Sequence, residues 1–396
     1  MTGEVTSIWS NHKLGDLVSF ITGKLDSNAA KPNGEYPFFT CSRETFKTDT
    51  YSFDCECVLL AGNNAAGIYP LKYFKGKFDA YQRTYVVRST DNRRLTNRFL
   101  FYSLQPKLEL LKSISTGVAT KFLTLTILKD LTLSIPHLDI QQKIAAILSA
   151  YDDLIENNLR RIKILEEIAQ TLYWEWFVKF RFPGHQKVKT VNSSMGKIPE
   201  GWEINNLFEL ADVTYGFPFK SSLFNVNREG IPVVRIRDVL DGQSATFTTE
   251  DAPDKYIVHD GDFLVGMDGD FHMGFWAGGT AFLVQRVARF RPRGEVGRYG
   301  LALSLKEPIE HFNKTITGTT VAHLGDNHLR TINVMMPYKK LLKVINDILE
   351  PLLDLQLNIR AKNKNLRQTR DLLLPKLISG ELDVSELDIT IPEAKA

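Results

Sequence analysis

Two long stretches of this sequence place a mostly apolar residue at alternating intervals of four and three positions, and neither stretch contains a glycine. This spacing predicts an α-helix with a single apolar stripe, the a/d pattern of a coiled coil. The stripe must be buried, so each helix needs a partner along its length. The first stripe contains Ile144, Leu148, Tyr151, Ile155, Asn158, Ile162, Leu165, Ala169, Leu172 and Trp176. The second contains Ile345, Leu349, Leu352, Gln356, Ile359, Asn363, Leu366, Arg370, Leu373 and Leu377.

The two stripes belong to an internal duplication of the chain, with a period of about half its length. Short motifs recur in the same order in both halves, which chance matches would not produce. The recurring pairs are Trp9 and Trp202, Gly23 and Gly216, Gln82-Arg83 and Gln285-Arg286, Thr116-Gly117 and Thr317-Gly318, and Pro136 and Pro337. The last two pairs lie 201 positions apart, as do the two stripes.

A duplicated chain is expected to have a pseudo-two-fold axis, and an axis perpendicular to the stripes makes the two helices antiparallel. Asn158 and Asn363 are polar residues on the stripes, where they would fix the register of the pair at some cost in stability. The alternative is that each helix packs only on its own domain. A stripe of more than four heptads is long for a core helix, which favours the coiled coil.

The remainder of each half is composed of short apolar runs separated by Gly, Pro, Asn and Asp, which predicts a compact α+β domain with a mostly antiparallel sheet. Predicted strands are 57–60, 84–88, 233–236 and 281–284, and 98–111 is predicted to be helical. Residues 181–202 have the composition of a linker. The fold class is therefore α+β, with two duplicated domains joined by two long helices that form an antiparallel coiled coil. The expected boundaries are 1–140 and 183–338 for the domains, and 141–182 and 339–396 for the helices with the C-terminal tail.

The composition of the 396 residues, 43% hydrophobic and 24% charged, predicts a soluble globular protein. Met1–Thr6 lack the features of a signal peptide, and no apolar run is long enough to span a membrane. The cysteines, Cys41, Cys55 and Cys57, include no CxxC pair, so we expect free thiols in a reducing compartment and no zinc site. The phosphate loop, the dinucleotide fingerprint, the zinc helix and the nucleophile elbow are all missing from the sequence.

The strongest acidic cluster of the sequence lies between Asp260 and Asp270 and also contains Asp262 and Asp268. Four carboxylates around a short strand could hold a hard cation. The first half of the duplication has Glu56 and Asn63-Asn64 at the related places, so half of such a site would be missing there. Two of the four aspartates precede glycine, as in turns. The turn interpretation is favoured, and a metal-dependent nuclease site stays open as the alternative. His323 and His328, five residues apart, are interpreted as surface residues and not as metal ligands.

Four segments resemble the specificity subunit of type I restriction-modification systems. Residues 136–148 and 174–184 are similar to the start and the end of the central conserved region of that family. Residues 372–382 are similar to the C-terminal counterpart, and 198–202 to the entry into the second recognition domain. The resemblance covers essentially the whole chain.

The resemblance implies that each α+β domain is a target-recognition domain that reads one half of a split site in double-stranded DNA. It implies that the helices act as a spacer and dock two modification (methyltransferase) subunits, and that restriction subunits complete the complex. No cofactor is then expected in this chain: S-adenosylmethionine belongs to the modification subunit, and ATP and Mg²⁺ to the restriction subunit. The chain would be cytoplasmic and non-catalytic. The first stripe is roughly 50 Å long, so the half-sites should lie about one helical turn apart.

Charge differs between the two domains. Residues 1–140 contain 17 Lys+Arg and 13 Asp+Glu, whereas residues 190–337 contain 14 and 18. The second domain therefore needs a local basic face to bind DNA. Arg and Asn side chains are suited to guanine and adenine edges, although a surface ion pair is the favoured role for any single arginine. The three arginines of 289–293 shift the balance toward phosphate contacts. Candidate DNA-binding residues are Arg43, Asn63, Asn64, Arg83, Lys121, Lys220, Arg235, Arg237, Arg286, Arg289, Arg291 and Arg293.

Two further interpretations remain. A fused nuclease or methyltransferase fragment would need an acidic metal site or an Asn/Asp-Pro-Pro-aromatic motif, and the sequence lacks that motif. The other interpretation is a coiled-coil scaffold unrelated to DNA. Salt-dependent binding to duplex DNA would distinguish a DNA-binding subunit from such a scaffold. The loops that follow Thr116-Gly117 and Thr317-Gly318 are either tight turns or loops that enter a DNA groove.

Overall fold

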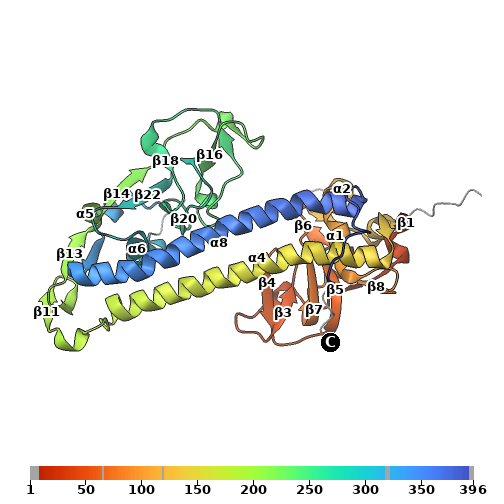
Figure 1. Ribbon diagram of the computed structural model, residues 1–396, viewed down its shortest axis with the longest axis horizontal. Helices are drawn as coiled ribbons and strands as arrows, with labels where there is room; N and C mark the ends of the chain where they lie inside the picture. The colour runs from red at the N-terminus through yellow and green to blue at the C-terminus, as the bar shows by residue number, and fades with distance from the viewer. Residues whose placement is uncertain (1–8, 65–66, 118–119, 317–321, 392–396) are drawn as a thin grey trace, which may run out of the picture. The chain divides into compact units, whose positions relative to one another are not determined.

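A computed structural model describes residues 9–64, 67–117, 120–316 and 322–391 (Figure 1). The chain divides into two compact units, the first formed by Met1–Ile155 with Leu366–Ala396 and the second by Glu156–Asn365. Each unit contains one α+β domain with parts of the two long helices. The predicted absence of a signal peptide at Met1–Thr6 concerns residues outside the described ranges.

The first unit is built on a six-stranded sheet of order β2-β8-β5-β7-β3-β4. Its neighbouring strands are antiparallel except for β3 and β7, so the prediction of a mostly antiparallel sheet is confirmed. The predicted strands 57–60 and 84–88 lie within β5 and β8. The strands are β2 (Val18–Thr22), β3 (Tyr36–Phe39), β4 (Thr45–Thr48), β5 (Phe53–Ala61), β7 (Leu71–Ala80) and β8 (Thr84–Ser89).

Side chains of β5 alternate between two apolar clusters, as the two-residue period of a strand requires. Val58 and Leu60 belong to the main core under the helices. Cys57 and Leu59 face the opposite cluster, with Phe78. Because both faces are covered, this end of β5 reads as one continuous apolar run.

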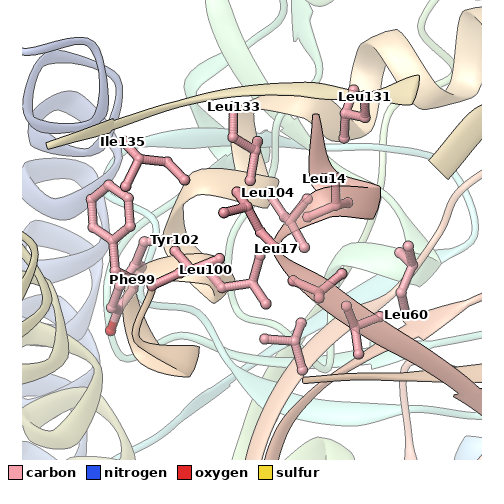
Figure 2. Packing of buried hydrophobic residues seen from close by; sticks show 14 of the residues in the cluster. Leu14, Leu17, Leu60, Phe99, Leu100, Tyr102, Leu104, Leu131, Leu133 and Ile135 are labelled. Carbon is pink, nitrogen blue, oxygen red and sulfur yellow. The ribbon is translucent and has the colours of Figure 1, made fainter. Parts of the chain in front are cut away.

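The main core of the first unit lies between the sheet and three short helices, α1 (Asn97–Leu104), α2 (Leu108–Ile114) and α3 (Leu125–Asp130). Figure 2 shows Leu14, Phe99 and Leu104 among the side chains that fill it. The prediction that 98–111 is helical is confirmed, although the segment is not one continuous α-helix. A 3₁₀ turn at Gln105–Lys107 separates α1 from α2, because Pro106 has no amide hydrogen to continue the helical bonding.

Strand β1 (Trp9–Lys13) pairs with β10 (Thr132–Pro136), and β10 leads into the first long helix, α4 (Leu138–Tyr173). Ile144 and Leu148 of α4 are fully buried in the core of the first unit. Leu374 and Leu377 of the second long helix, α8 (Lys339–Ser379), share this core. The start of the first stripe and the end of the second stripe therefore pack in the core of the same domain.

The second unit repeats this arrangement in two smaller sheets, of order β14-β22-β19-β20 and β15-β17-β16-β21-β18. The parallel pair β16–β21 corresponds to β3–β7 of the first unit. The strands are β14 (Ala211–Tyr215), β15 (Phe224–Asn225), β16 (Ile231–Val234), β17 (Phe247–Thr248), β18 (Ile257–Val258), β19 (Phe263–Gly266), β20 (Met273–Phe275), β21 (Ala281–Leu283) and β22 (Val287–Pro292).

Two sequence expectations in the second unit need correction. The strand predicted at 233–236 ends at Val234, because the Asp238 carboxylate accepts the Arg235 amide hydrogen at 3.0 Å and starts a 3₁₀ turn. The segment 181–202 is folded and is not an open linker. It forms the hairpin β11–β12 (Thr190–Ser193 and Gly196–Pro199), and Trp202 is buried against the ring of Phe177.

The remaining elements of the second unit connect the sheets to the long helices. Strand β13 (Glu203–Asn206) pairs with β23 (Asn333–Met336), as β1 pairs with β10. Helix α6 (Arg298–Thr315) packs Tyr299 and Leu303 against Leu349 of α8. The short helices are α5 (Leu207–Leu210) and α7 (Asp326–Leu329).

The long helix predicted from the first stripe is confirmed by α4, which a π turn at Trp174–Val178 closes. Within the second unit α4 and α8 are joined by Asn158–Asn363 and by an ion pair of Arg360 with Glu166 at 3.0 Å. Within the first unit Arg370 bonds Asp152 at 2.6 Å. Residue numbers rise along one helix as they fall along the other, which is the antiparallel order. A continuous coiled coil over the whole length of both stripes stays a prediction.

Most predicted stripe residues are buried, but α8 departs from the pattern at two places. Leu353 is buried where Leu352 was expected, and Leu374 is buried where Leu373 was expected. Leu374 belongs to the core of the first unit, and Leu353 belongs to a cluster of the second unit that contains Tyr299 of α6 and Ala169 of α4. At both places α8 packs on a domain as well as on the partner helix. No helix within the described ranges is long and apolar enough to cross a membrane.

Candidate nucleic-acid interface

Three loops of the first unit meet at one end of its sheet. The backbone amide of Gly62, which follows β5, donates to the carbonyl of Arg83 at 2.8 Å. The amide of Leu123 donates in turn to the carbonyl of Gly62 at 2.9 Å. We call residues 62–64, 81–83 and 121–122 the first loop platform. The approach is so close that a Cβ at position 62 would lie 2.6 Å from the Arg83 carbonyl oxygen, so only glycine fits there.

The first loop platform brings together four of the residues predicted to bind DNA. Asn63 and Asn64 form the two-residue strand β6, which pairs with Phe122 and Lys121 of β9. The guanidinium of Arg83 lies 5.5 Å from the centre of the Phe122 ring, a cation–π contact. Arg83 and Phe122 also line a surface hollow, together with Gly62 and Gln82.

Arg43, the fifth candidate of the first domain, lies on the neighbouring loop. Two residues before it, the Cys41 thiol donates to Oδ1 of Asn63 at 3.0 Å, which fixes this loop against the platform. Arg43 itself is exposed and lines a separate hollow with Tyr69 and Phe101.

The second unit repeats the same backbone hydrogen bonds. The amide of Met267 donates to the carbonyl of Arg286 at 2.8 Å, and the amide of Leu324 donates to the carbonyl of Met267 at 2.8 Å. We call residues 267–269, 284–286 and 322–323 the second loop platform. Met267 thus occupies the place of Gly62, and Arg286 the place of Arg83. The duplication seen in the sequence is therefore preserved at the level of individual hydrogen bonds.

The side chains of the second loop platform form an ionic cluster. Nη1 of Arg286 donates to Oδ2 of Asp268 at 2.5 Å. Nδ1 of His323 lies 2.6 Å from the other carboxylate oxygen, Oδ1. Where the first platform has Asn63 and Phe122, the second has Asp268 and His323. The two platforms share a backbone but present different chemical groups.

Arg289, Arg291 and Arg293 lie elsewhere, on and beside β22. Arg289 is only 4% exposed; it donates to the carbonyl of Ile257 and to Oγ1 of Thr214, and burial lowers the pKa of its guanidinium. Arg291 bonds both carboxylate oxygens of Asp262, at 2.7 and 2.8 Å, and this contact raises its pKa. These side chains hold the sheet together.

Arg293 also has an acidic partner, because its Nε donates to Oδ1 of Asp212 at 2.9 Å. This contact raises the pKa of the Arg293 guanidinium. Arg235 donates to Asp238 and to Thr246, so it stabilises the turn after β16.

Two other candidates of the second domain, Lys220 and Arg237, are exposed. They lie on the loops that follow β14 and β16, outside the platform.

Sequence reasoning missed Asp268, His323 and Phe122 as members of the platforms. His323 was interpreted as a surface residue and Asp268 as part of an acidic cluster. The signal that identifies them is the repeat itself, because Phe122 and His323 lie 201 positions apart, like the helix stripes. The isolated bridge between Asp268 and His323 then corresponds to the pairing of Asn63 with Phe122.

One recurring motif, Thr116-Gly117, lies beside the first platform. Gly117 has a positive φ of 105°, and Thr116 exchanges two backbone hydrogen bonds with Phe122, at 2.7 and 3.1 Å. These bonds hold Thr116 at the edge of the first platform. The corresponding Thr317-Gly318 lies outside the described residues.

The acidic cluster at 260–270 is occupied by structural contacts. Asp260 accepts the amide hydrogen of Gly279 at 2.7 Å, Asp262 holds Arg291, and Asp268 holds Arg286. Gly261 and Gly269 have φ values of +86° and +69°, which fits the Asp-Gly turn interpretation. Among the described residues, no group of three or more His, Cys, Asp or Glu side chains is arranged to hold a metal ion.

Curated proteins that resemble this chain are specificity subunits. The MjaVIII specificity subunit of Methanocaldococcus jannaschii, a type I restriction enzyme subunit, is 26% identical over 413 residues, which cover 96% of this chain and 94% of the relative. The MjaIX specificity subunit of the same organism is 28% identical over 74% of this chain and 71% of the relative. The crystal structure of a type I restriction-modification S subunit from M. genitalium has a similar fold, with a TM-score of 0.61 and 18% identity over 93% of this chain and 96% of the other.

The sequence pattern of one family matches both halves separately. That family is described as the type I restriction modification DNA specificity domain, and it matches residues 7–168 and 199–368. Each match contains one α+β domain with the helix stripe that follows it. The chain therefore belongs to the family of type I restriction modification DNA specificity domains.

Proposed function

We propose that this chain is the DNA-specificity subunit of a type I restriction-modification complex, and that each loop platform reads one half of a bipartite target in double-stranded DNA. The observation that carries this proposal is the repeated set of backbone hydrogen bonds that presents Arg83 in one domain and Arg286 in the other. Two equivalent readers in one chain fit a target with two half-sites. Arginine is the side chain most suited to guanine edges, and asparagine to adenine edges.

Phosphate contacts position a protein on DNA, and contacts with base edges provide the sequence preference. In the first domain, Lys121 and Arg43 are basic side chains near the platform and suit the phosphate role. In the second domain the net charge is negative, so exposed Lys220 and Arg237, on the loops that follow β14 and β16, are the proposed phosphate contacts. Arg289 already has buried acceptors inside its domain, which favours a structural role for it.

The modification subunits are proposed to dock on the outer faces of the long helices. Leu154 of α4 is 51% exposed, and Leu355, 201 positions later on α8, is 40% exposed. An apolar residue that recurs at an exposed helix position suits two copies of one partner. In the second unit Ile164, Ile168 and Trp176 also line a surface groove.

The chemistry of the complex is assigned to the partners. S-adenosylmethionine would be bound by the modification subunits, and ATP and Mg²⁺ by the restriction subunits. This chain would contribute recognition and spacing without catalysis, in the cytoplasm. The support for this assignment is the length over which the chain matches specificity subunits.

The decisive experiment is co-expression with the modification subunit, followed by sequencing of methylated genomic sites. We expect a split motif with an unread gap, methylated at adenine. An intact complex that methylates no common motif would overturn the proposal. Binding to duplex DNA should also weaken steeply as salt rises, because phosphate contacts release counterions. Salt-insensitive binding, or none, would favour a scaffold without a DNA partner.

The docking surface is tested separately by Ile168→Asp, which places a charge in the groove of the second unit. We expect less modification subunit to copurify with this variant. Val226→Asp is the matched control, because Val226 is a 77% exposed apolar residue in the loop between β15 and β16, outside the long helices and the groove. Equal recovery of the partner with both variants would contradict this position of the docking surface.

A further inference from the structure

We propose that Arg286 reads a guanine in the second half-site and that Asp268 is the positioning residue that holds its guanidinium for this contact. The inference rests on the proposed function and deepens it, because it assigns one base contact to one side chain. It concerns the second loop platform alone.

The hydrogen bonds of Arg286 leave its base-reading edge open. Only Nη1 has a partner among the described residues, the Oδ2 atom of Asp268. Nε and Nη2 therefore keep their hydrogens available, and the side chain is 50% exposed. A guanidinium presents five N–H donors in a fixed plane. Two of them on one edge match the O6 and N7 acceptors of guanine in the major groove.

Other arginines of this domain differ on this point. Arg291 uses both Nε and Nη2 on Asp262. Arg293 uses Nε and Nη2 on Asp212 and Nη1 on a backbone carbonyl. In those two side chains the Nε and Nη2 donors, which a guanine would need, already have acceptors within the domain. Arg286 is held by one nitrogen only, which distinguishes it from Arg291 and Arg293.

Asp268 is itself held from several directions. His323 bonds its Oδ1 atom at 2.6 Å, while the amide of Gly269 donates to the carbonyl of Ala322 at 2.9 Å. The backbone of Arg286 is tied to the same loop through the amide of Met267. The carboxylate side chain is only 20% exposed. A guanidinium anchored this way loses little further freedom on binding, which favours both affinity and discrimination.

The backbone at Arg286 supports a role for its side chain. Its φ is +75°, in the left-handed region that glycine or asparagine adopts readily and that other residues rarely adopt. Arg286 occupies the turn between β21 and β22, where glycine would relieve the strain. The turn therefore keeps an arginine in spite of an unfavourable conformation, and strain of this kind is concentrated at functional sites.

The first platform shows what the carboxylate adds. Arg83 occupies the same turn, but Asn63 stands in the place of Asp268, and Arg83 lies over the ring of Phe122. Asp268 neutralises much of the charge of Arg286, so this arginine contributes less to general attraction by phosphates. Its contribution in the second domain is then sequence preference.

The test is the methylated motif of the complex with its modification subunits, determined for the wild type and for Arg286→Gly. Glycine is suited to the positive φ, so this variant should fold at least as well as the wild type. We expect one G·C pair of the second half-site to lose preference about 5- to 150-fold, the range of one bidentate contact. The first half-site and the gap should stay unchanged. Asp268→Asn should weaken the same preference by a smaller factor.

Two matched variants complete the design. Arg83→Ala should alter the first half-site only, and Arg293→Ala, which removes a paired surface arginine, should alter neither. An unchanged second half-site in Arg286→Gly would overturn the inference, and so would an equal loss of preference at every position of both half-sites. In either case a split motif in the wild type would still support the proposed function. A second half-site without any G·C pair would also overturn it. A wild-type complex without a motif would instead overturn the proposed function itself.

Discussion

Nδ2 of Asn158 donates a hydrogen bond of 2.8 Å to Oδ1 of Asn363 across the two long helices of the second unit. The repeat relates these two positions to Ile359 and Ile162, which are both buried and apolar. The polar pair therefore occurs once, although the helices are duplicated. A single amide pair in an apolar seam has a lower energy in one register than in the others, so this contact specifies how α4 meets α8.

Replacing one member of this pair should destabilise the chain. Asn158→Ile leaves Oδ1 of the buried Asn363 without this donor, and we expect a loss of about 1–3 kcal/mol in the free energy of unfolding. The double variant Asn158→Ile/Asn363→Ile should recover most of that loss, because both polar groups are gone. Denaturant unfolding of the wild type, both single variants and the double variant measures the coupling. Additive losses in the double variant would show that the two amides act independently.

Tyrosine ionisation should destabilise the first unit at high pH. The hydroxyl of Tyr102 donates to Oδ2 of Asp152 at 2.7 Å, and burial together with that carboxylate raises the pKa of Tyr102 above its usual value. The raised pKa gives stability that is present below about pH 10 and is lost above it, because the unfolded tyrosine then releases its proton. We expect a slope of at most about 1.4 kcal/mol per pH unit from this group.

The measurement is the free energy of unfolding between pH 8 and 11 for the wild type and Tyr102→Phe. The variant should be less stable near pH 8, where it lacks the hydrogen bond, and its stability should fall less between pH 10 and 11. Parallel curves for the two proteins would contradict the assignment to Tyr102.

The three cysteines should react with a thiol reagent in a fixed order. Cys41 is partly exposed, while burial raises the pKa of Cys55 and, more strongly, of Cys57. The thiolate is the reactive form, so we expect labelling of Cys41 first, Cys55 next and Cys57 last. Mass spectrometry of timed samples gives the order. Labelling of Cys57 as fast as in the denatured chain would show that the sheet interior opens readily.

Shortening both helices together should change the gap in the DNA target. Deletion of 154–160 from α4 and of 362–368 from α8 removes Asn158 and Asn363 as a pair and retains the contact of Asp152 with Arg370. Seven residues correspond to about 10 Å, or about three base pairs of DNA. The unread gap should shorten by about that number while both half-sites stay the same. Mapping of methylated sites checks the result, and an unchanged gap would contradict a spacer role for the helices.

The parts of the fold that were predictable from sequence depend on local periodicity. The four-three spacing of Ile144 and Leu148 is a property of α4 alone, and the apolar run of Cys57–Leu60 is a property of one strand. Pairings between distant segments were not predictable in this way. Leu353 is more deeply buried than Leu352 in a cluster that contains Tyr299 of α6 as well as Ala169 of α4, so contacts from both neighbours act on α8 there.

The candidate site shows the same limit. The repeat placed Arg83 and Arg286 at equivalent positions, but their neighbours depend on the backbone bonds of Gly62 and Met267 to loops far away in sequence. In the sequence, Arg289 and Arg291 were candidates for the same reason as Arg286, as basic residues of a domain with a negative net charge. Only their acceptors in the folded domain, such as Asp262, distinguish structural arginines from one with an open edge.

The backbone bonds that build each loop platform start and end within one unit, from Gly62 to Arg83 in the first and from Met267 to Arg286 in the second. Within the described residues none of these backbone bonds joins one platform to the other, and sites that share no partners change independently. If each reader has its own set of attainable half-sites, the number of full targets is the product of the two sets and not their sum. Duplicating one modest domain thereby gives a large repertoire of targets from few sequence changes.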